Sequence, residues 1–600
     1  MSAARENGAA VLGRDVRKAF RRGTGEVVKA LDDVSFEVHH GALAALVGPD
    51  GAGKTTLIRL IAGLMPLDAG ELKVMGIDVA AEPQQVQDRI AYMPQRFGLY
   101  EDLSVQENLD LYADLHGVAD EERAKRYPEL LEMTALVPFT RRLAGRLSGG
   151  MKQKLGLACT LVRSPALLLL DEPTVGVDPL SRRELWEIIV RLVRDQDITV
   201  LLSTSYLDEA ERCDQVFVLR EGKVLASGRP SVVSNLAAGL AFQAAPLPGE
   251  AARSLQSRLL GDPTIIDAVP EAGRVHLVRA EADFGRGPAK TGSPLAGVPV
   301  VPVQARFEDG FMVLLRQQTG AERKTPTALP PARRAEGGSA ETVIQVHDLV
   351  RKFGAFTAVD RISFDVHRGE IFGLLGPNGA GKTTTFRMLC GLLSATAGTL
   401  RVAGLDLRRA RASARQHIGY VAQKFSLYGQ LSVRENLDFF ASAYGLRGSR
   451  KHGRIEWAIQ QFELRELMHL QSGQLPGGYK QRLAMAAALL HEPEILFLDE
   501  PTSGADPLAR REFWQRITIL AEQGVTVVVT THFMEEAEYC DRIAILDSGR
   551  VLAEGTPAAV RGHAPPREAG EPNMEDAFIA IVEKARNRKP AASQPAEGGL

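Results

Sequence analysis

Two nearly identical octapeptides constrain this chain more than any other feature. Residues 48–55 read Gly-Pro-Asp-Gly-Ala-Gly-Lys-Thr, and residues 376–383 read Gly-Pro-Asn-Gly-Ala-Gly-Lys-Thr, an offset of 328 positions (382 − 54). The same offset relates three later landmarks of the two halves: Gln95 and Gln423, Asp171-Glu172 and Asp499-Glu500, and Asp178 and Asp506. An offset kept over so many positions indicates that one domain occurs twice in tandem.

Each octapeptide lies between an apolar run and a helical pattern. Residues 42–47 and 371–375 are continuous apolar runs, as expected of strands buried on both faces. Strand, glycine-rich loop and helix in this order are the context of a phosphate-binding loop, in which glycines free the backbone N–H groups, the lysine adds a charge and the threonine can reach Mg²⁺. The N-terminus of the following helix adds roughly half a unit of positive charge. We expect the loops to bind nucleotide through Gly48, Gly51, Gly53, Lys54, Thr55 and Thr56, and through Gly376, Gly379, Gly381, Lys382, Thr383 and Thr384.

A hydrophobic strand that ends in Asp-Glu follows in both halves, at residues 167–172 and 495–500. An acid that follows a buried strand can hold Mg²⁺, and a neighbouring carboxylate can polarise the attacking water. We therefore expect Asp171 and Asp499 to hold Mg²⁺, together with Thr55 and Thr383. We expect Glu172 and Glu500 to act as general bases. The alternative interpretation is that these acids cap a loop.

The pattern predicts α/β domains, each with a mainly parallel sheet flanked by helices and with a helical segment at residues 104–160 or 432–488. Residues 34–38 and 362–366 alternate like half-buried strands. Between the repeats, a partly strand-like region predicts a small α+β accessory subdomain, and a Pro- and Gly-rich stretch predicts a flexible linker. The expected divisions are 1–235 and 342–563 for the two nucleotide-binding domains, 236–320 for the accessory subdomain, 321–341 for the linker, and 564–600 for a C-terminal element and disordered tail.

Composition excludes several classes of protein. The 600 residues, 45% apolar and 24% charged, suffice for two to four globular domains. A net charge of −2 disfavours a protein that coats a phosphate backbone, so nucleic acid is not an expected partner. The four cysteines include no CxxC pair, which disfavours a zinc site or disulfide framework. No stretch approaches the roughly 18 apolar residues that a membrane helix needs, and no secretory leader is expected.

Further motifs make both halves resemble the ATP-binding cassette (ABC) ATPases almost end to end. Residues 147–153, Leu-Ser-Gly-Gly-Met-Lys-Gln, resemble the signature motif of that family. The resemblance implies that Gln95 and Gln423 are Q-loop residues at ATP and Mg²⁺, that Asp178 and Asp506 belong to D-loops, and that His532 is the catalytic switch histidine. It also implies that the signature helix of one domain closes over the γ-phosphate held by the loop of the other. To the ATP-binding residues it adds Ser148, Gly149, Gly150, Gly477 and Gly478, with Phe20 and Phe353 stacking on adenine.

The stretch after each Q-loop bears on the kind of ABC protein. Residues 97–109 and 425–437 resemble the surface on which ABC-2-type exporters seat a cytoplasmic helix of a membrane subunit. The Ser-Val-x-Glu-Asn pattern inside it is also a good helix start. Within the exporters, the chain resembles tandem ATP-binding subunits of multidrug ABC-2 transporters. This resemblance implies two membrane-spanning permease subunits, identical or different, with the chain peripheral on the cytoplasmic face of a bacterial inner membrane. The cargo, a drug-like or envelope compound, is not specified by an ATPase.

Three alternatives share the tandem arrangement. Ribosome-associated translation factors of the ABC type resemble one another in a long charged helical linker, whereas residues 321–340 are punctuated by Pro and Gly. Tandem ATPases of sugar importers typically have one eroded phosphate loop, and both loops are intact here. A zinc-bearing DNA-repair ABC protein would need more cysteines. The translation-factor type is the main alternative to an exporter.

The two halves differ at two expected ATP contacts. The first half has Ser205 where the second has His532, and the second has Pro476 where the first has Ser148. Head-to-tail pairing, as the resemblance implies, would put both losses in the site built on Lys54. Proline is tolerated in the first turn of a helix, so we expect the second signature helix to form. We expect the Lys382 site to hydrolyse ATP in each cycle, and the Lys54 site to bind it and turn over slowly.

Overall fold

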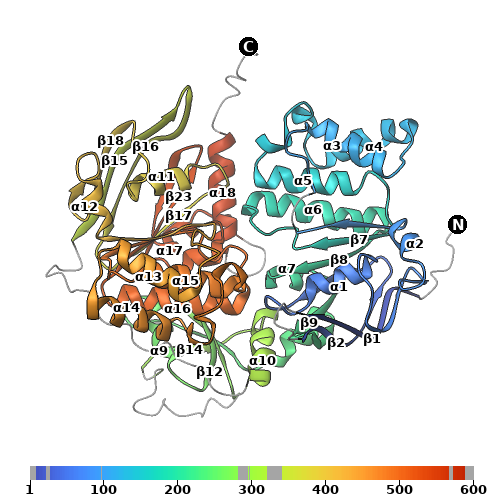
Figure 1. Ribbon diagram of the computed structural model, residues 1–600, viewed down its shortest axis with the longest axis horizontal. Coiled ribbons are helices and arrows are strands. Elements are labelled where there is room, and N and C mark those ends of the chain that lie inside the picture. Colours follow the sequence, from blue (N-terminus) through green and yellow to red (C-terminus); the bar gives the residue numbers. More distant parts are fainter. Residues whose placement is uncertain are drawn as a thin grey trace.

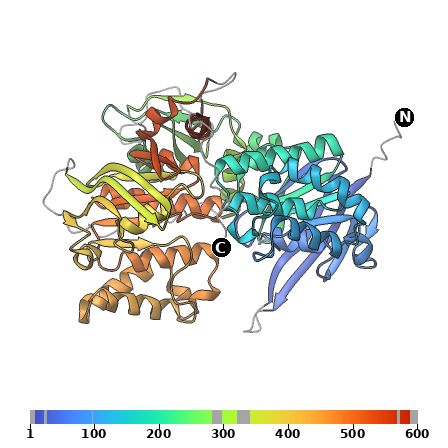
Figure 2. The same ribbon diagram turned by 90° about the horizontal axis from the view of Figure 1, so that it is seen from above.

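The computed structural model describes residues 8–21, 27–95, 98–281, 295, 297–319, 341–566 and 572–587. Figure 1 shows two similar halves side by side, with the segment that connects them in sequence lying below and between them, and Figure 2 shows the same halves in contact from above. The predicted linker and the predicted disordered tail lie outside the described residues, except for Glu341 and the C-terminal residues up to 587. None of the helices in the described part of the chain combines the length and hydropathy that a bilayer crossing requires.

Each half contains a six-stranded, mainly parallel sheet. In the first half the strand order is β10(Lys223–Gly228), β9(Gln215–Arg220), β3(Leu43–Val47), β8(Thr199–Thr204), β7(Leu167–Asp171), β6(Ile90–Met93). In the second half it is β24(Arg550–Gly555), β23(Arg542–Asp547), β17(Ile371–Leu375), β22(Thr526–Thr531), β21(Ile495–Asp499), β20(Ile418–Val421). Only the β9–β10 and β23–β24 pairs are antiparallel. The predicted α/β class is confirmed, and the central strands are apolar because both of their faces are buried.

A second, antiparallel sheet in each half was not predicted from the sequence. It is formed by β2(Val27–His39), β1(Ala9–Arg21), β4(Ala69–Val74) and β5(Ile77–Asp78), and by β16(Phe356–His367), β15(Thr342–Phe353), β18(Ala397–Val402) and β19(Leu405–Asp406). Phe36 of β2 and Leu46 of β3 share a core with Leu57 of the helix α1(Lys54–Ile61). One face of the main sheet is therefore covered by a sheet and a helix, whereas helices alone were expected.

The helical segments lie where the sequence predicts them. They contain α3(Val105–Leu115), α4(Asp120–Met133), η1(Val137–Phe139), η2(Ala144–Arg146) and α5(Gly149–Thr160), and α13(Val433–Ala443), α14(Gly448–Gln461), η4(Arg465–Leu467), η5(Ser472–Gln474) and α15(Gly477–Ala488). The remaining helices of the two halves are α2(Pro83–Gln87), α6(Pro179–Gln196), α7(Leu207–Glu211), α8(Pro230–Ser234), η3(Asn235–Ala237), α11(Lys382–Leu389), α12(Arg411–Arg415), α16(Pro507–Glu522), η6(Met534–Tyr539), α17(Pro557–Arg561) and α18(Met574–Asn587). Capping boxes at Ser104–Glu107 and Ser432–Glu435 start α3 and α13.

The segment between the halves folds into a small α+β subdomain. Its sheet has the order β12(Ile265–Glu271), β13(Arg274–Arg279), β11(Ala241–Ala244), β14(Val300–Pro302), and its helices are α9(Ala252–Leu260) and α10(Phe307–Thr319). Helix α10 packs on α7 and α8 of the first half, while α9 packs on α16 of the second. The subdomain therefore bridges the two halves. Helix α18 packs on α17 and η6, as α10 packs on α8 and α7, so the repeat includes this terminal helix.

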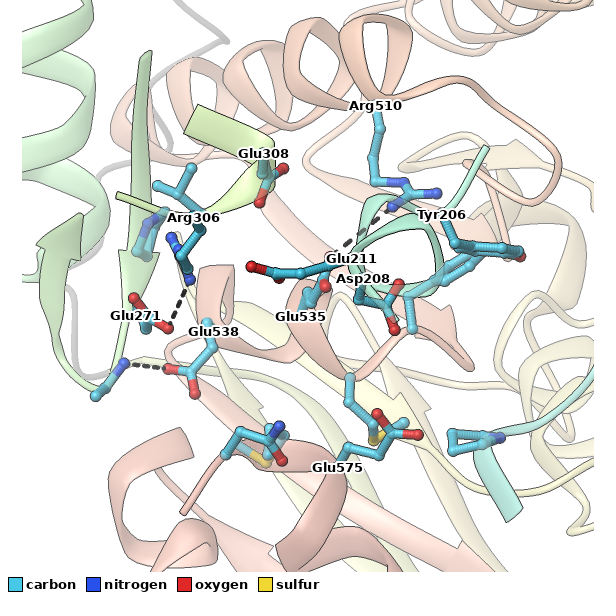
Figure 3. Close-up of a pocket in the computed structure, with 18 of the residues that line it drawn as sticks. Tyr206, Asp208, Glu211, Glu271, Arg306, Glu308, Arg510, Glu535, Glu538 and Glu575 are labelled. Carbon is cyan, nitrogen blue, oxygen red and sulfur yellow. Dashed lines mark hydrogen bonds and ion pairs between the residues drawn. The ribbon is translucent and has the colours of Figure 1, made fainter. Parts of the chain in front are cut away.

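Ion pairs and a hydrogen bond connect the subdomain to the second half. Arg253 Nε lies 2.8 Å from Asp541 Oδ1, and the Ala272 N–H donates to Glu538 Oε2 at 3.1 Å. Arg511 of α16 contacts both Asp267, at 3.3 Å, and Glu308. Of these residues, Glu308, Arg511 and Glu538 line a cavity of about 680 Å³ between the halves, which is drawn in Figure 3.

Acidic side chains crowd this cavity. Figure 3 shows Asp208 of the first half, Glu308 of the subdomain and Glu535 of the second half around it. Desolvation inside the cavity raises the pKa of Glu535 to about 7 although its side chain is 62% exposed, and the negative charges of Glu308 and Asp208 act in the same direction. The neighbouring arginines, Arg510 and Arg511, are therefore needed to compensate the negative charge at the junction.

Replacing Arg511 by alanine is expected to destabilise the junction. Asp267 is buried, and removal of one partner from a buried ion pair typically costs about 3–5 kcal/mol because the other charge remains unpaired. Urea denaturation followed by tryptophan fluorescence measures this loss. Arg183→Ala is the matched control because Arg183 forms exposed pairs with Glu187 and Glu583, which are worth about 0–1 kcal/mol. Equal losses of stability in the two variants would contradict the bridging role of Arg511.

Candidate functional site

The two octapeptides form tight loops that cannot accept larger residues. Gly53 and Gly381 have φ angles of 106° and 99°, in the left-handed region that disfavours other residues. A Cβ atom on Gly48 would lie 2.1 Å from the Leu219 carbonyl oxygen, and one on Gly376 would lie 2.3 Å from that of Leu546. Helices α1 and α11 begin at the loop lysines, Lys54 and Lys382. The first N–H groups of a helix have no partner within it, so a helix that starts in a glycine-rich loop suits a phosphate group.

The loop lysines are buried and lie close to the predicted general bases. Lys54 Nζ donates to the Gly48 carbonyl at 2.7 Å and lies 3.8 Å from Glu172 Oε1. Lys382 Nζ lies 2.5 Å from the Gly376 carbonyl and 3.8 Å from Glu500 Oε1. Each half therefore brings its predicted phosphate-binding lysine and its predicted base into one site.

The same two glutamates have a strained backbone and fixed side chains. Their φ angles, 51° at Glu172 and 45° at Glu500, are unusual for residues other than glycine. Gln95 Nε2 donates to Glu172 at 2.5 Å, and Gln423 Nε2 donates to Glu500 at 2.7 Å. The backbone N–H of each glutamate donates at 2.9 Å to a hydroxyl of the adjacent strand, that of Ser203 in the first half and that of Thr530 in the second. Strain of this kind clusters at functional sites, where the surrounding structure holds it.

The acids before these glutamates lie among hydroxyl groups. Asp171 Oδ1 accepts from Thr55 Oγ1 at 3.0 Å and from Ser203 Oγ at 2.7 Å. Its second oxygen, Oδ2, is buried and has no hydrogen-bond partner in the described part of the chain. Asp499 accepts from Thr530 Oγ1 at 2.6 Å. A threonine hydroxyl beside a buried carboxylate with an unused oxygen fits a hard cation such as Mg²⁺, whose other ligands would be phosphate and water.

The two sites differ electrostatically at the switch position. His532 Nδ1 lies 3.2 Å from Glu500 Oε2, and the other ring nitrogen, Nε2, has no hydrogen-bond partner among the described residues. Burial raises the pKa of Glu500, but the imidazole and the Lys382 ammonium outweigh burial and hold it below its ordinary value. Ser205 is buried at the equivalent position of the first half. The pKa of Glu172 is raised by burial, despite the opposing charge of Lys54.

Each phosphate loop faces the D-loop and signature segment of the other half. The Asp50 N–H donates to Asp506 Oδ2 at 3.2 Å, and Asn378 Nδ2 donates to the Gly176 carbonyl at 3.2 Å. A Cβ atom on Gly477 would lie 3.3 Å from Asp50 Oδ2, and one on Gly149 would lie 3.4 Å from Asn378 Nδ2. The halves are thus arranged head to tail. The Lys54 loop lies beside the signature segment that contains Pro476, and the Lys382 loop lies beside the one that contains Ser148.

The two signature helices begin at equivalent residues although their N-caps differ. Ser148 caps α5 by accepting from the Met151 N–H at 3.3 Å. The second signature helix, α15, forms as predicted, but Pro476 is its N-cap and not part of its first turn, and it offers no side-chain acceptor.

The predicted adenine-stacking residues are exposed at the ends of β1 and β15. The side chains of Phe20 and Phe353 are 42% and 47% exposed. Lys18 lies 5.8 Å from the first ring centroid, and Arg351 lies 4.5 Å from the second. Both rings are accessible, and their stacking on a base stays a prediction.

The expected docking stretches present exposed aromatic side chains. Tyr100 and Tyr428 are 57% and 50% exposed, next to the starts of α3 and α13. Phe97 of the first stretch lies outside the described residues. The capping boxes at Ser104 and Ser432 show that the Ser-Val-x-Glu-Asn pattern starts a helix in both halves, independently of any role in docking a membrane subunit.

Sequence analysis missed two groups of residues at these sites. Ser203 and Thr530 each bond both the acid and the following glutamate of their site. Asp50 and Asn378 make the contacts between the halves described above. The only sequence signal for the second group was the third position of the octapeptide, the single place where the two copies differ.

Comparison with known proteins agrees with the repeated architecture. The family model "ABC transporter" matches residues 31–175 and 359–503. The chain is 49% identical over 92% of its length to the "Probable multidrug ABC transporter ATP-binding protein YbhF" of Escherichia coli K12, covering 95% of that protein. It is 42% identical over 36% of its length to the "Nod factor export ATP-binding protein I" of Burkholderia lata, covering 72% of that protein. A solved ATP-binding subunit of an ABC transporter is 30% identical over 40% of the chain, with a TM-score of 0.37.

Proposed function

We propose that this chain, which belongs to the ABC transporter family of ATP-binding proteins, is the ATPase subunit of an ABC-2-type exporter. The observation that carries the proposal is the head-to-tail arrangement of two complete phosphate-loop sites within one chain. The names of the similar proteins, which include multidrug and Nod factor export ATP-binding proteins, support an export role. ATP hydrolysis would then drive efflux of a drug-like or envelope compound through separate membrane subunits.

The residues of each site have separable roles in this proposal. The loop backbone and the lysine would bind the phosphates of ATP, and Thr55 with Asp171 would hold Mg²⁺, which neutralises developing phosphate charge when bound. Glu172 and Glu500 would orient water and accept its proton, each fixed by its Q-loop glutamine. His532 Nδ1 lies beside Glu500, which leaves Nε2, unpartnered among the described residues, to contact the nucleotide.

The two sites are proposed to be unequal. The Lys382 site combines Glu500, His532 and the Ser148 signature segment, while the Lys54 site lacks the imidazole and faces Pro476. Both losses fall in one site because the halves pair head to tail. The Lys382 site would therefore hydrolyse ATP in each cycle, and the Lys54 site would bind ATP and turn over slowly.

The proposed partners are two ABC-2-type permease subunits, with this chain peripheral on the cytoplasmic face of a bacterial inner membrane. Affinity purification of the tagged chain from detergent-solubilised membranes is expected to recover both subunits. The double variant Tyr100→Ala, Tyr428→Ala is expected to lose most of that recovery. Each of these side chains is exposed next to the start of α3 or α13, on the surface proposed to receive a helix of the membrane subunit. Val301→Ala, an exposed substitution in the subdomain, is the matched control. Recovery with ribosomes in place of membrane proteins would favour the translation-factor alternative.

A further inference from the structure

The third position of the phosphate loop differs between the two ATP sites and lies at a contact between the halves. In the second half this position is Asn378, whose amide donates to the Gly176 carbonyl of the first half at 3.2 Å. In the first half it is Asp50. An ionised carboxylate has no proton to donate, so the Lys54 loop cannot make the side-chain bond that joins the Lys382 loop to the opposite D-loop.

The carboxylate of Asp50 instead faces the start of a helix in the other half. Its Oδ2 lies next to Gly477, the first residue of α15, where an added Cβ would be only 3.3 Å away. Helix N-termini attract anions because their N–H groups are free and their dipole is positive at that end. The equivalent neighbour of α5 is Asn378, which is neutral. An acidic side chain therefore stands at one signature helix, and an uncharged side chain stands at the other.

Charged groups of the same sign surround Asp50. Asp506, the N-cap of α16, accepts from the Asp50 backbone, and Glu172 lies close enough to be influenced by the Asp50 charge. Lys54, on the same loop, is the opposing positive charge. Desolvation between the halves and the charge of Asp506 raise the pKa of Asp50 above its ordinary value although the residue is exposed, and Lys54 only partly offsets them. A bound triphosphate would add further negative charge to this group.

We propose that Asp50 acts as an internal anion that competes with the terminal phosphate of a nucleotide for the N-terminus of α15, so that the Lys54 site closes less firmly than the Lys382 site. This inference rests on the proposed function, because it assumes that both loops bind ATP. Asp50 is thus a specificity-determining residue that tunes closure without taking part in bond breaking. Closure is favoured when Asp50 is protonated or neutral, because the competition and the repulsion from Asp506 then disappear.

The test uses the full chain with only one loop competent for binding. In a Lys382→Ala background, affinity for a fluorescent ATP analogue with Mg²⁺ is measured across a pH series from acidic to mildly alkaline. We expect Asp50→Asn to tighten binding about 3- to 10-fold at the alkaline end of the series. This range corresponds to the loss of a modest charge repulsion together with the gain of one hydrogen bond like that of Asn378. We also expect it to remove most of the pH dependence. The matched reverse variant, Asn378→Asp in a Lys54→Ala background, is expected to weaken binding and to introduce a pH dependence.

The outcomes separate this inference from the proposed function. If Asp50→Asn changes neither the affinity nor its pH dependence while the Lys54 site still binds ATP, the role of Asp50 is refuted and the ATPase assignment stands. If the Lys54 site binds no ATP in any variant, the proposal of two ATP sites fails and the inference fails with it. A tightening seen with Asp50→Asn but absent with Asp50→Ala would also refute the competition, because it would come from the new amide hydrogen bond and not from loss of the charge.

Discussion

Glu500→Gln is expected to abolish nearly all ATP hydrolysis by the assembled transporter. A positioned general base contributes roughly 10²- to 10⁴-fold to rate, and glutamine keeps the shape of glutamate but cannot accept the proton of water. The structure holds Glu500 between Gln423, at 2.7 Å, and His532, at 3.2 Å, so the amide would occupy the same position. The loss should therefore appear in kcat, with ATP affinity nearly unchanged.

The matched variant, Glu172→Gln, is expected to leave a large fraction of the activity. The Lys54 site has Ser205 at the switch position and faces the signature segment that contains Pro476. If the two sites are unequal as proposed, this site contributes little to ATP turnover. Steady-state phosphate release by the two single variants measures the difference. Equal losses would refute the asymmetry between the sites but would leave the ATPase assignment in place.

The main features of the fold were predictable because the buried strands are continuous apolar runs. Leu167–Leu170 and Ile495–Leu498 have no polar residue that could face solvent, and their short length favours a strand in the middle of a covered sheet. The two phosphate loops could also be predicted, because glycines at this spacing indicate a backbone that turns tightly and approaches its neighbours closely. Ser104 and Ser432 likewise predicted the starts of α3 and α13.

Other features depend on contacts that are distant in sequence. The antiparallel sheets could not be assigned from Val34–Val38 alone, because alternation indicates a half-buried strand but does not identify its partner. The contacts of Asp50 with the other half join residues 456 positions apart. Arg511 helps the subdomain to bridge the halves through its ion pair with the buried Asp267. From the sequence alone, an arginine on a helix is expected to face solvent, so this contact could not be predicted.

Lys54→Ala and Lys382→Ala are expected to weaken ATP binding each at its own site. A charge-assisted contact to a buried phosphate is worth roughly 1.5–3 kcal/mol, which corresponds to a loss of affinity of about 10- to 150-fold. In the structure each ammonium group is buried and bonded to carbonyls of its own loop, so it already lies at the cradle that would hold the phosphates.

Titration of the full chain with a fluorescent ATP analogue distinguishes the two variants. Each single variant should retain one high-affinity site, and only Lys382→Ala should also remove most of the steady-state hydrolysis. Lys73→Ala, an exposed position on β4, is the control for loss of a lysine outside the loops. Two ATP molecules bound to the double variant with unaltered affinity would overturn the assignment of both loops. A hydrolytic defect equal in both single variants would show that the sites work as an obligate pair, because a slow Lys54 site could not then be dispensable for turnover.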